Sequence, residues 1–521
     1  MNLGEIFCRH VLRDPGAEAV VDGDIRRTYD AWYDEVLHVA GGLRLRGLKS
    51  GDHFVAVLSN RYETATLYWA SQVLGAIFTP FNWRANDEEI AYVLEDAEAV
   101  AVAFEERSRG AVGGALARVG TGGGIVTYDI DDDSFAALRA SKPVDGPSGV
   151  PETDICLMLY TSGTTGRPKG VPRSHRAERL AAIHCVAQLN YQYRESTLGV
   201  MPMFHTMGIR SILMSMALNG TLVCLPAWDA ETAMRLIQDE EIATLFLVPT
   251  MFHDMLHHPK RGEYDLSSAR NIGYAGMAMT SALTDLCARE FQPRHFTNFY
   301  GSSEIYCFSI CNHVARKPGC AGRAGIGQII RVVTADPDGG SGPDDIVAQG
   351  ESGEIIAPMD GMEAFSGYWK RPDADAKSIR DGWYFTGDLG YFDADGELYV
   401  VGRVDDMVIS GGENIYPEEV EDVLSKSPLV AQVAVVGLPD DRMGSKIVAF
   451  VEPASDACNS EALDAWCLDS TLARFKRPRA YAFVKSIPRS AAGKLLRRFL
   501  RDGDYELLPD FKSTLNQGTK E

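Results

Sequence analysis

The chain has 521 residues, more than one hydrophobic core usually supports, so we expect at least two domains. Hydrophobic residues make up 45% and charged residues 24% of the sequence, as in most folded globular proteins. The formal net charge of −21 argues against a nucleic-acid-binding protein, because such a protein needs a basic face. An acidic chain that binds an anionic ligand must concentrate its positive groups locally.

The first part of the chain alternates short β-rich runs with helical ones. Residues 53–60 predict a strand, residues 63–75 an amphipathic helix, and residues 86–97 a further helix. The alternation continues through residues 244–250 and 271–279. Strand–helix–strand units of this size indicate a mostly parallel sheet with helices packed on it.

The two ends of the chain show no targeting signal. Residues 1–16 lack the basic run and apolar stretch of a signal peptide, and residues 516–521 form no peroxisomal address. The longest apolar run, residues 211–228, is interrupted by Asn219 and Gly220, so we expect a buried helix, a turn and a strand rather than a membrane span. We therefore expect a cytoplasmic protein.

A loop with the composition of a phosphate-binding site follows a predicted strand. Residues 155–161 are an apolar run that leads directly into TSGTTGRPKG, residues 161–170. Backbone N–H groups of such a loop can form an anion-binding nest, Thr and Ser add hydroxyl donors, and Lys169 adds a positive charge. The spacing is not that of the P-loop of nucleotide triphosphatases, and a glycine-rich surface turn is the alternative interpretation.

Ten cysteines are scattered along the chain, and we interpret them as reduced, mostly buried thiols. Cys307, Cys311, His313 and Cys320 lie close together in sequence, which makes a metal site conceivable. The chain lacks a CxxC pair, however, and structural zinc ligands are usually more tightly spaced. We interpret these four residues as the wall of a strand and a loop.

The character of the sequence changes near residue 400. Residues 430–438 and 446–453 predict strands, and residues 462–474 predict a helix. A small α+β domain of about a hundred residues is plausible here. We place the boundary at Arg403 to Asp406, between an N-terminal domain of residues 1–403 and a C-terminal domain of residues 404–521.

The loop is one of six motifs that occur in a set order, the others being PMFHTMG, NFYGSSE, GWYFTGDLG, GRVDDMVISGGENIYPEEVE and IPRSAAGKLLRR. Together they resemble the adenylate-forming superfamily of acyl- and aryl-CoA synthetases, adenylation domains and beetle luciferases. Within it, the chain looks most like bacterial 4-chlorobenzoate–CoA ligase and its relatives. The resemblance implies an α/β fold with a large N-terminal domain of mostly parallel sheets and a small, mobile α+β C-terminal domain.

The resemblance also implies a reaction in two halves. A carboxylate attacks the α-phosphorus of magnesium ATP to give an acyl-adenylate and pyrophosphate, and the thiol of coenzyme A then displaces AMP. Lys494 would bridge the carboxylate and the α-phosphate, Glu304 would bind Mg²⁺, and Asp388 would bind the ribose. The implied nucleotide site consists of hydroxyl, glycine, aromatic and charged residues, namely Thr161, Ser162, Gly163, Thr164, Thr165, Lys169, Ala275, Gly276, Asn298, Phe299, Tyr300, Gly301, Ser302, Ser303, Asp388 and Arg403.

The second half-reaction and the acid need further contacts. The small domain would swing about Asp405, and His205 would lie beside the carboxylate. Candidate coenzyme A contacts are Arg84, Ser410, Gly411, Gly412, Phe475, Arg477 and Arg479. The candidate acyl pocket comprises His184, His205, Met207, Ala275, Gly301, Tyr306 and Cys307.

The acid is predicted from departures within this pocket. His184, Tyr306 and Cys307 differ from the chlorobenzoate-type pocket and make one end of it more polar, which favours a substituted aromatic acid with a hydroxyl or amino group. A medium-chain or alicyclic acid remains open, as does an enzyme that loads an aryl acid onto a carrier protein. A homodimer is possible.

Overall fold

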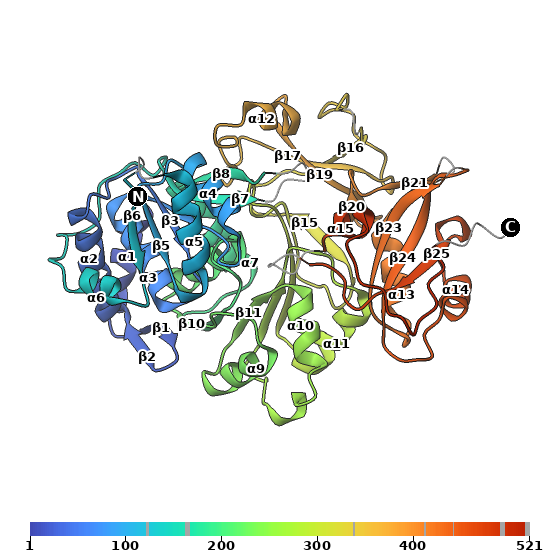
Figure 1. Cartoon of the computed structure of the whole chain (residues 1–521), viewed down its shortest axis with the longest axis horizontal. Coiled ribbons are helices and arrows are strands. Elements are labelled where there is room, and N and C mark those ends of the chain that lie inside the picture. The colour runs from blue at the N-terminus through green and yellow to red at the C-terminus, as the bar shows by residue number, and fades with distance from the viewer. Residues whose placement is uncertain are drawn as a thin grey trace.

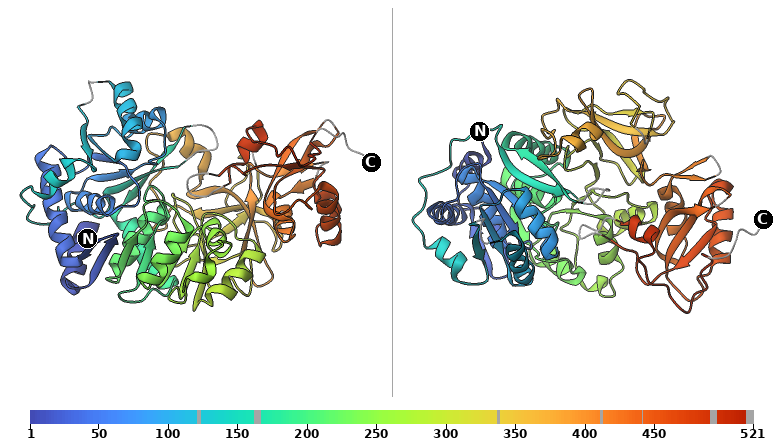
Figure 2. Two further views of the ribbon diagram at one scale, coloured as in Figure 1. Left: turned by 60° about the horizontal axis from the view of Figure 1, so that its bottom comes forward. Right: turned by 45° about the horizontal axis from the view of Figure 1, so that its top comes forward.

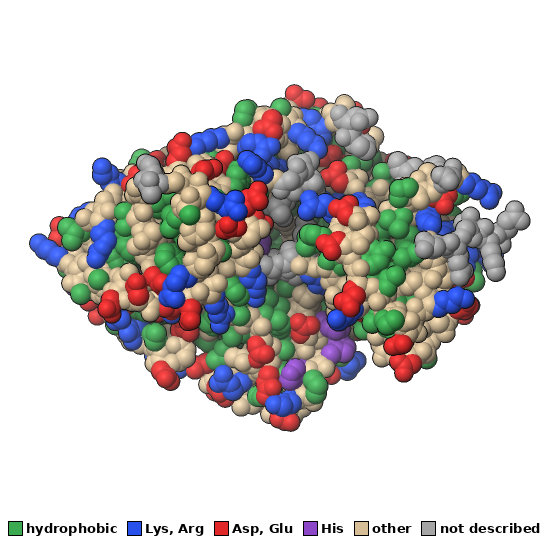
Figure 3. All heavy atoms as spheres, viewed as in Figure 1, with side chains coloured by type: hydrophobic (Ala, Val, Ile, Leu, Met, Phe, Trp, Pro, Cys, Tyr) green, Lys and Arg blue, Asp and Glu red, His purple; other side chains and the backbone are tan. Residues whose placement is uncertain are grey.

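The computed structural model describes residues 1–120, 124–161, 167–336, 339–410, 413–440, 442–489 and 495–515. The N-terminal helices and strands lie at one end of the molecule and the C-terminal strands at the other, as Figure 1 and both views of Figure 2 show. On the face shown in Figure 3, acidic and basic side chains are interspersed.

The first sheet has six strands in the order β6-β5-β3-β4-β7-β8. Its strands are parallel from β6 to β7, and β8 runs antiparallel to β7. The strand predicted at residues 53–60 is confirmed as β3. The strands are β3 (His53–Val57), β4 (Ile77–Pro80), β5 (Ala101–Phe104), β6 (Val126–Asp129), β7 (Ile155–Thr161) and β8 (Lys169–Ser174).

Helices cover both faces of this sheet because the side chains of its strands alternate between two cores. Phe54 of β3 packs with the helices of one face, and Val55 packs with those of the other. The first group is α1 (Leu3–Arg13), α2 (Tyr29–Leu45), α3 (Tyr62–Leu74) and α6 (Asp133–Arg139), and the second is α4 (Asp87–Asp96) and α5 (Glu106–Val119). Asn86 starts α4 with a capping box, since its side chain accepts from the Glu89 backbone and Glu89 bonds back.

Helix α3 corrects the prediction of an amphipathic helix at residues 63–75. All of its residues except Glu63 are buried. The helix lies against α1 and α2 and against strands β1 and β4, which belong to different sheets. A helix enclosed on all sides has no polar face to present to solvent.

The second sheet has 14 strands, and its first part is parallel along β1-β10-β9-β11-β12-β13, with β2 antiparallel at the edge. Helices α9, α10 and α11 pack with these strands in one core. The strands are β1 (Glu18–Asp22), β2 (Ile25–Thr28), β9 (Ser196–Gly199), β10 (Thr221–Cys224), β11 (Thr244–Leu247), β12 (Asn271–Tyr274) and β13 (His295–Tyr300). The helices are α7 (His175–Gln188), α8 (Thr206–Ala217), α9 (Ala230–Asp239), α10 (Pro249–Leu256) and α11 (Ser281–Phe291).

The apolar run at residues 211–228 is a buried helix, a turn and a strand, as predicted. Helix α8 ends at Ala217, Asn219 adopts a left-handed φ of 49°, and β10 follows. Among the helices of the described residues, none combines the length and hydropathy that a membrane span requires.

The remainder of the second sheet is antiparallel along β13-β14-β15-β20-β19-β17-β16, which the sequence interpretation did not anticipate. One local signal was present: Asp381 and Gly382, with φ of 48° and 77°, form the tight turn between β18 and β19. The elements are β14 (Ser309–Cys311), β15 (Cys320–Ala324), β16 (Arg331–Val333), β17 (Gly353–Pro358), α12 (Pro372–Ser378), β18 (Ile379–Arg380), β19 (Trp383–Phe392) and β20 (Leu398–Arg403).

The C-terminal part mixes helices with a three-stranded sheet, β23-β24-β25, and the hairpin β21-β22. The helix predicted at residues 462–474 is wrong in extent, because α14 ends at Asp469 and Arg474–Lys476 forms a separate short 3-10 helix. The elements are β21 (Val408–Ser410), β22 (Glu413–Ile415), α13 (Pro417–Ser425), β23 (Val430–Asp440), β24 (Gly444–Pro453), α14 (Ser460–Asp469), β25 (Ala480–Phe483) and α15 (Arg497–Asp502). With the N-terminal sheets, this part completes the predicted α/β fold.

Candidate active site

The predicted nucleotide residues gather where strands of both sheets end. Thr161 is the last residue of β7, Tyr300 of β13, and Arg403 of β20, while Ala275 and Gly276 directly follow β12. In open α/β sheets, ligands bind at the carboxyl ends of the strands. Seven of the residues predicted for the nucleotide and coenzyme A sites lie outside the described residues, namely Ser162, Gly163, Thr164, Thr165, Gly411, Gly412 and Lys494.

Lys169, Tyr368 and Glu304 form a chain of contacts at the start of β8. The ammonium of Lys169 lies 4.0 Å from the centre of the Tyr368 ring, and the Tyr368 hydroxyl donates to Glu304 Oε1 at 2.6 Å. Burial lowers the pKa of Lys169, while the charge of Glu304 opposes this shift. The result is a buried carboxylate next to a cation, with a hydroxyl that orients the carboxylate. The sequence interpretation missed Tyr368.

The turn from Tyr300 to Tyr306 fixes the direction of Glu304. A Cβ at Gly301 would lie 1.9 Å from the backbone oxygen of Tyr306, so only glycine fits there. The Ser302 hydroxyl accepts from the backbone N–H groups of Glu304 and Ile305, at 3.2 and 3.3 Å. Ser302 therefore stabilises the turn itself, and Ser303 is half-buried beside it.

Asp388 is held from two sides. The Tyr300 hydroxyl donates to Oδ2 at 2.8 Å, and Arg403 donates to Oδ1 at 2.7 Å. Asp388 raises the pKa of the Arg403 guanidinium, and burial raises the pKa of Tyr300 well above its ordinary value. The structure thus brings together three residues that the sequence assigned to the nucleotide.

The resemblance implies that adenine lies against Tyr300 with Ala275, Gly276 and Asn298 at its edge, and the structure holds these residues and the neighbouring Phe299 in different ways. Gly276 has a φ of 85°, a conformation that favours glycine, and a Cβ there would meet its nearest atom only at 3.5 Å. The Asn298 amide donates to the backbone oxygen of Cys320 at 2.8 Å. Phe299 is buried and packs edge-on against Phe246. Gly276 is therefore required by backbone conformation rather than by lack of space.

His184 forms a close pair with a residue that the sequence interpretation missed. Its Nδ1 lies 2.5 Å from Glu363 Oε1, and the side chains are 11% and 2% exposed. Glu363 lies in the irregular segment between β17 and α12, outside every motif, so no sequence pattern pointed to it. The pair places a fixed, hydrogen-bonded imidazole on α7.

A second buried ionic cluster surrounds Tyr306. The guanidinium groups of Arg173 and Arg210 lie 4.0 and 4.1 Å from the centre of its ring. Glu178 binds both cations, at 2.9 and 3.3 Å, and its side chain is fully buried. Arg173 also donates to the backbone oxygens of Glu304 and Glu363. Tyr306 is thus part of a charged core that supports the turn.

Two of the other predicted acyl-pocket residues lie at the start of α8, a helix that packs against α7. His205 is the N-cap residue of α8 and packs against Phe204, with ring centroids 4.8 Å apart. Met207 is buried in the first turn of the same helix. The Cys307 thiol is buried, and Gln188 lies within a long hydrogen bond of 3.9 Å.

The predicted coenzyme A residues fall into separate groups. The guanidinium of Arg84 lies 4.0 Å from the Trp83 ring, which Arg107 also approaches, and burial lowers the pKa of Arg84. Ser410 is buried at the end of β21, and Phe475 is exposed.

Carboxylates pair with the basic run at residues 474–479. Arg477 binds Asp464, and Lys476 binds Glu419 at 2.6 Å. Arg479 is exposed. The local positive charge expected of this run is therefore partly neutralised.

Charged residues concentrate at the joint where the sequence places the hinge. Asp405 is exposed, and its neighbour Asp406 binds Arg497 and Arg501 of the C-terminal part, at 3.5 and 3.1 Å. Arg489, which precedes Lys494 by five positions, lies 4.0 Å from the sulfur of Met277. This contact sets the segment before Lys494 against the loop that follows Gly276.

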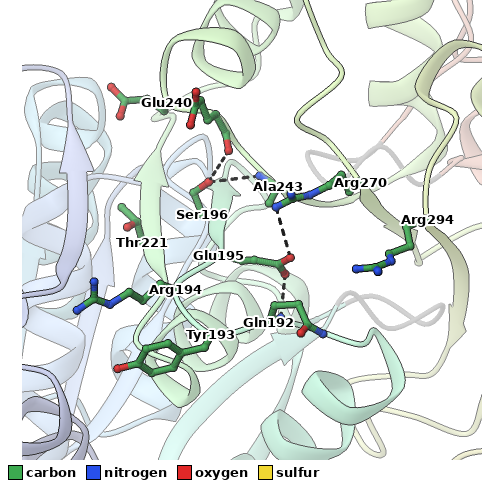
Figure 4. A pocket seen from close by; sticks show the side chains of 11 residues that line it. Gln192, Tyr193, Arg194, Glu195, Ser196, Thr221, Glu240, Ala243, Arg270 and Arg294 are labelled. Carbon is green, nitrogen blue, oxygen red and sulfur yellow. Dashed lines mark hydrogen bonds and ion pairs between the residues drawn. The ribbon is translucent and has the colours of Figure 1, made fainter.

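A polar cavity of about 520 Å³ lies elsewhere on the molecule (Figure 4). Ser196 and Thr221 begin strands β9 and β10, and Arg270 and Arg294 directly precede β12 and β13. The cavity is therefore at the amino ends of the parallel strands, opposite the carboxyl ends where the candidate site lies. Within it, Glu195 pairs with Arg270 at 3.8 Å.

The chain belongs to the AMP-binding enzyme family, whose model matches residues 7–369; the model of the AMP-binding enzyme C-terminal domain matches residues 419–494. It is an AMP-forming acid–CoA ligase, with an acid, ATP and coenzyme A as substrates.

Similar proteins act on different acids. The chain is 30% identical over 508 residues to long-chain-fatty-acid–CoA ligase FadD13 of Mycobacterium tuberculosis, covering 96% of this chain and 98% of the relative. It is 31% identical over 514 residues to 4-chlorobenzoate–CoA ligase of an Arthrobacter species, covering 96% and 94%. The structure of the anthranilate CoA ligase AuaEII with anthranoyl-AMP has a TM-score of 0.89 at 25% identity, covering 97% of each chain. The resemblance to the chlorobenzoate enzyme is thus no stronger than that to the fatty-acid enzyme.

Proposed function

We propose that this ligase activates a substituted aromatic carboxylic acid whose hydroxyl or amino group is recognised by His184. The observation that carries the proposal is the 2.5 Å contact between His184 Nδ1 and the buried Glu363 carboxylate. A carboxylate that binds one imidazole nitrogen fixes the ring and leaves the other nitrogen for a ligand.

Such a site discriminates by hydrogen bonding. A ligand with a polar group satisfies the imidazole, whereas an alkyl chain of the same shape leaves a buried polar group without a partner. Tyr306 supports this preference, because a ring held between two cations has little freedom to move aside for a long chain. The anthranilate CoA ligase with which the fold is shared takes an amino-substituted aromatic acid by its name.

The first half-reaction brings two anions together, so neutralising charge and aligning the reactants are its main requirements. Thr161 and Lys169 would contact the β- and γ-phosphates, with Ser162, Gly163, Thr164 and Thr165 of the same loop. Lys494 would bridge the attacking carboxylate and the α-phosphate.

Mg²⁺ fits the donor chemistry at Glu304, because a hard cation prefers carboxylate oxygen and this one is buried beside the phosphate loop. When bound there, Mg²⁺ would offset phosphate charge. Tyr368 keeps one carboxylate oxygen oriented by donating to it. Asp388 would accept hydrogen bonds from the ribose hydroxyls, with Tyr300 and Arg403 holding its two oxygens.

The second half-reaction requires the C-terminal part to turn about Asp405 and bring Ser410, Gly411 and Gly412 to the cleft. His205 would gate the approach to the adenylate. Arg84, with Arg107 beside it, and the basic run at residues 474–479 would face the phosphates of coenzyme A.

The test compares acids that differ only in hydrogen bonding. The rate of AMP formation with ATP and coenzyme A is measured for hydroxybenzoates and aminobenzoates against the matching methylbenzoates at each ring position, with decanoate as the alkyl acid. We expect kcat/KM at one position to favour the polar member by about 10-fold or more. His184→Phe is expected to abolish that ratio. His257→Phe, which replaces an exposed histidine directly after α10, is expected to retain it.

An unchanged ratio in His184→Phe would overturn the recognition role, and a preference for decanoate would overturn the aromatic acid. Pyrophosphate exchange without any coenzyme A-dependent product would instead indicate loading of a carrier protein.

A further inference from the structure

Three side chains that can bind a metal meet where strands β14 and β15 join the rest of the sheet. Cys311 ends β14, His313 lies in the loop that follows, and Cys320 begins β15. One potential ligand atom from each lies within 4.8 Å of the others. Both thiols are buried and the imidazole is half-buried. Cys307 lies apart from this group, against Gln188 and Ser309.

We propose that Cys311, His313 and Cys320 form a structural Zn²⁺ site. Two thiolates and one imidazole are ligands that zinc prefers, and they suit neither Mg²⁺ nor Ca²⁺. Zinc bonds of 2.0–2.3 Å separate tetrahedral ligand atoms by roughly 3.3–3.8 Å, so small side-chain rotations suffice to close the site. Binding would release the protons of both thiols.

The groups around the three residues fit a metal site. Glu397 lies in the turn before β20, and its Oε1 is 3.1 Å from His313 Nε2. Metal-binding histidines are commonly oriented by a carboxylate in this way. Its Oε2 lies 3.8 Å from Cys320 Sγ, so the Glu397 carboxylate lies next to both the imidazole and one of the thiols. The backbone N–H of Gly322 donates to Cys320 Sγ at 3.2 Å, which stabilises a thiolate.

Two further features support this interpretation. Gly322 has a φ of 81°, and a Cβ there would lie 1.9 Å from the Ile310 oxygen, so the backbone that presents this N–H to the sulfur requires glycine. The His313 side chain is 40% exposed, which gives a metal a route from solvent. Lys317 lies 2.8 Å from Glu397, but its charge is shared with Asp393 and Asp395.

The metal would connect three segments behind the candidate adenine site. Cys311 pairs with Asn298 across β13 and β14, and Cys320 pairs with Tyr399 of β20. The Asn298 amide binds the backbone oxygen of Cys320. A metal at this junction would therefore fix both the loop at residues 312–319 and the residue proposed to face adenine. The expected effect of the metal on adenine binding rests on the proposed function, whereas the proposal that the metal is present does not.

The first test is the metal content of the full chain. Protein is purified without chelator, and its zinc content is measured by elemental mass spectrometry after acid digestion. We expect about one zinc per chain, and less than about 0.2 in Cys311→Ser and in Cys320→Ser. Cys458→Ser, which replaces a buried thiol in the C-terminal part, is the matched control and is expected to retain the zinc.

A second measurement does not depend on the variants folding. The zinc-free wild-type chain is titrated with Co²⁺ under reducing conditions. A sulfur-to-cobalt charge-transfer absorption that saturates near one equivalent, and that added Zn²⁺ removes, supports the site. Absence of that absorption together with metal-free purified protein would overturn the proposal, as would a Cys311–Cys320 disulfide in freshly isolated chain.

The effect on nucleotide binding is read separately. Removing zinc is expected to lower the melting temperature and to weaken AMP binding several-fold, with recovery of both when Zn²⁺ is restored. If the metal is present but AMP affinity is unchanged by its removal, the zinc site stands and its proposed effect on nucleotide binding is contradicted.

Discussion

The hydroxyl of Tyr300 lies 2.8 Å from Oδ2 of Asp388, so the last residue of β13 holds a carboxylate of β19. Arg403 holds the other oxygen from β20. The parallel and antiparallel parts of the 14-stranded sheet thus converge on one carboxylate. The orientation of the Asp388 carboxylate therefore depends on Tyr300 from the parallel part and on Arg403 from the antiparallel part.

Asp388→Ala is expected to weaken AMP and ATP binding by about 10- to 100-fold, because it removes both acceptors for the ribose. Tyr300→Phe keeps the carboxylate and deletes one of the two hydrogen bonds that orient it, and we expect a loss of about 3- to 10-fold. Isothermal titration with AMP measures both. An Asp388→Ala chain that binds AMP as tightly as the wild type would show that the ribose contacts another residue.

Glu304→Gln retains an acceptor for Tyr368 and removes the charge that Mg²⁺ would need. We expect the Mg²⁺ concentration for half-maximal pyrophosphate release to rise by about 10-fold or more. Tyr368→Phe is the comparison, since it keeps the carboxylate and deletes the hydrogen bond. Equal rises in the two variants would indicate that hydrogen bonding, rather than metal binding, explains the importance of Glu304.

Glu178→Leu is expected to lower the free energy of unfolding by about 3–5 kcal/mol, because it leaves two buried guanidinium groups without their shared carboxylate. Glu18→Leu breaks an exposed pair with Arg26 and should cost at most about 1 kcal/mol. Urea unfolding of both variants measures the difference. Similar losses of unfolding free energy in the two variants would mean that Tyr306 and the backbone stabilise the two guanidinium groups without Glu178.

Acid is expected to destabilise the fold through His175. Its Nδ1 accepts a hydrogen bond from the Leu3 backbone, and burial lowers the pKa of His175 from 6.5 to about 4. The unfolded chain therefore binds a proton near pH 6.5 that the folded chain does not bind until about pH 4. This contribution to stability is complete above pH 6.5 and is lost as the pH falls towards 4.

His175→Gln keeps an acceptor for Leu3 but does not titrate. The variant is expected to lose less stability than the wild type between pH 6.5 and 4.5, by up to ~1.4 kcal/mol per pH unit. The free energy of unfolding, measured in urea at several pH values, checks this. Parallel curves for the two chains would contradict the role of His175.

Asp405→Pro is expected to separate the half-reactions, because proline fixes the backbone angle φ at the proposed hinge. Pyrophosphate release in a single turnover should stay within about 3-fold of the wild type, while thioester formation falls by about 10-fold or more. Asp405→Ala removes the same carboxylate but leaves the backbone free, and both steps should stay near the wild-type rates. Equal losses of both steps in Asp405→Pro would place the hinge elsewhere.

The sequence predicted those helices and strands whose boundaries depend on neighbouring residues, such as helix caps and apolar runs. The capping box at Asn86 starts α4, and the apolar strand ending at Thr161 leads into the phosphate loop. Strand β19 was missed because its buried side chains do not alternate cleanly with exposed ones and because one of its partners, β17, lies far back in the sequence. Long-range pairing depends on contacts that a single sequence does not display.

The same limit applies to the site. Motifs located Asp388 and Tyr300, which the structure brings within a hydrogen bond. Glu363 and Tyr368 lie outside any motif, yet they contact His184 and Glu304. Arg173 also donates to the backbone oxygen of Glu363, 190 positions away in sequence, and partners of this kind emerge only from the fold. The roles assigned to the site residues stay predictions.

Arg403 binds Asp388 two positions before the proposed hinge, and the Val404 N–H donates to the Gly387 oxygen at 2.8 Å. The small domain is therefore not a detachable module appended after the nucleotide site. Recombination between related enzymes would have to keep Arg403 and Val404 with the large domain to preserve the position of Asp388. An engineered fusion of two such enzymes is therefore expected to retain the contacts of Asp388 only when its junction follows residue 404.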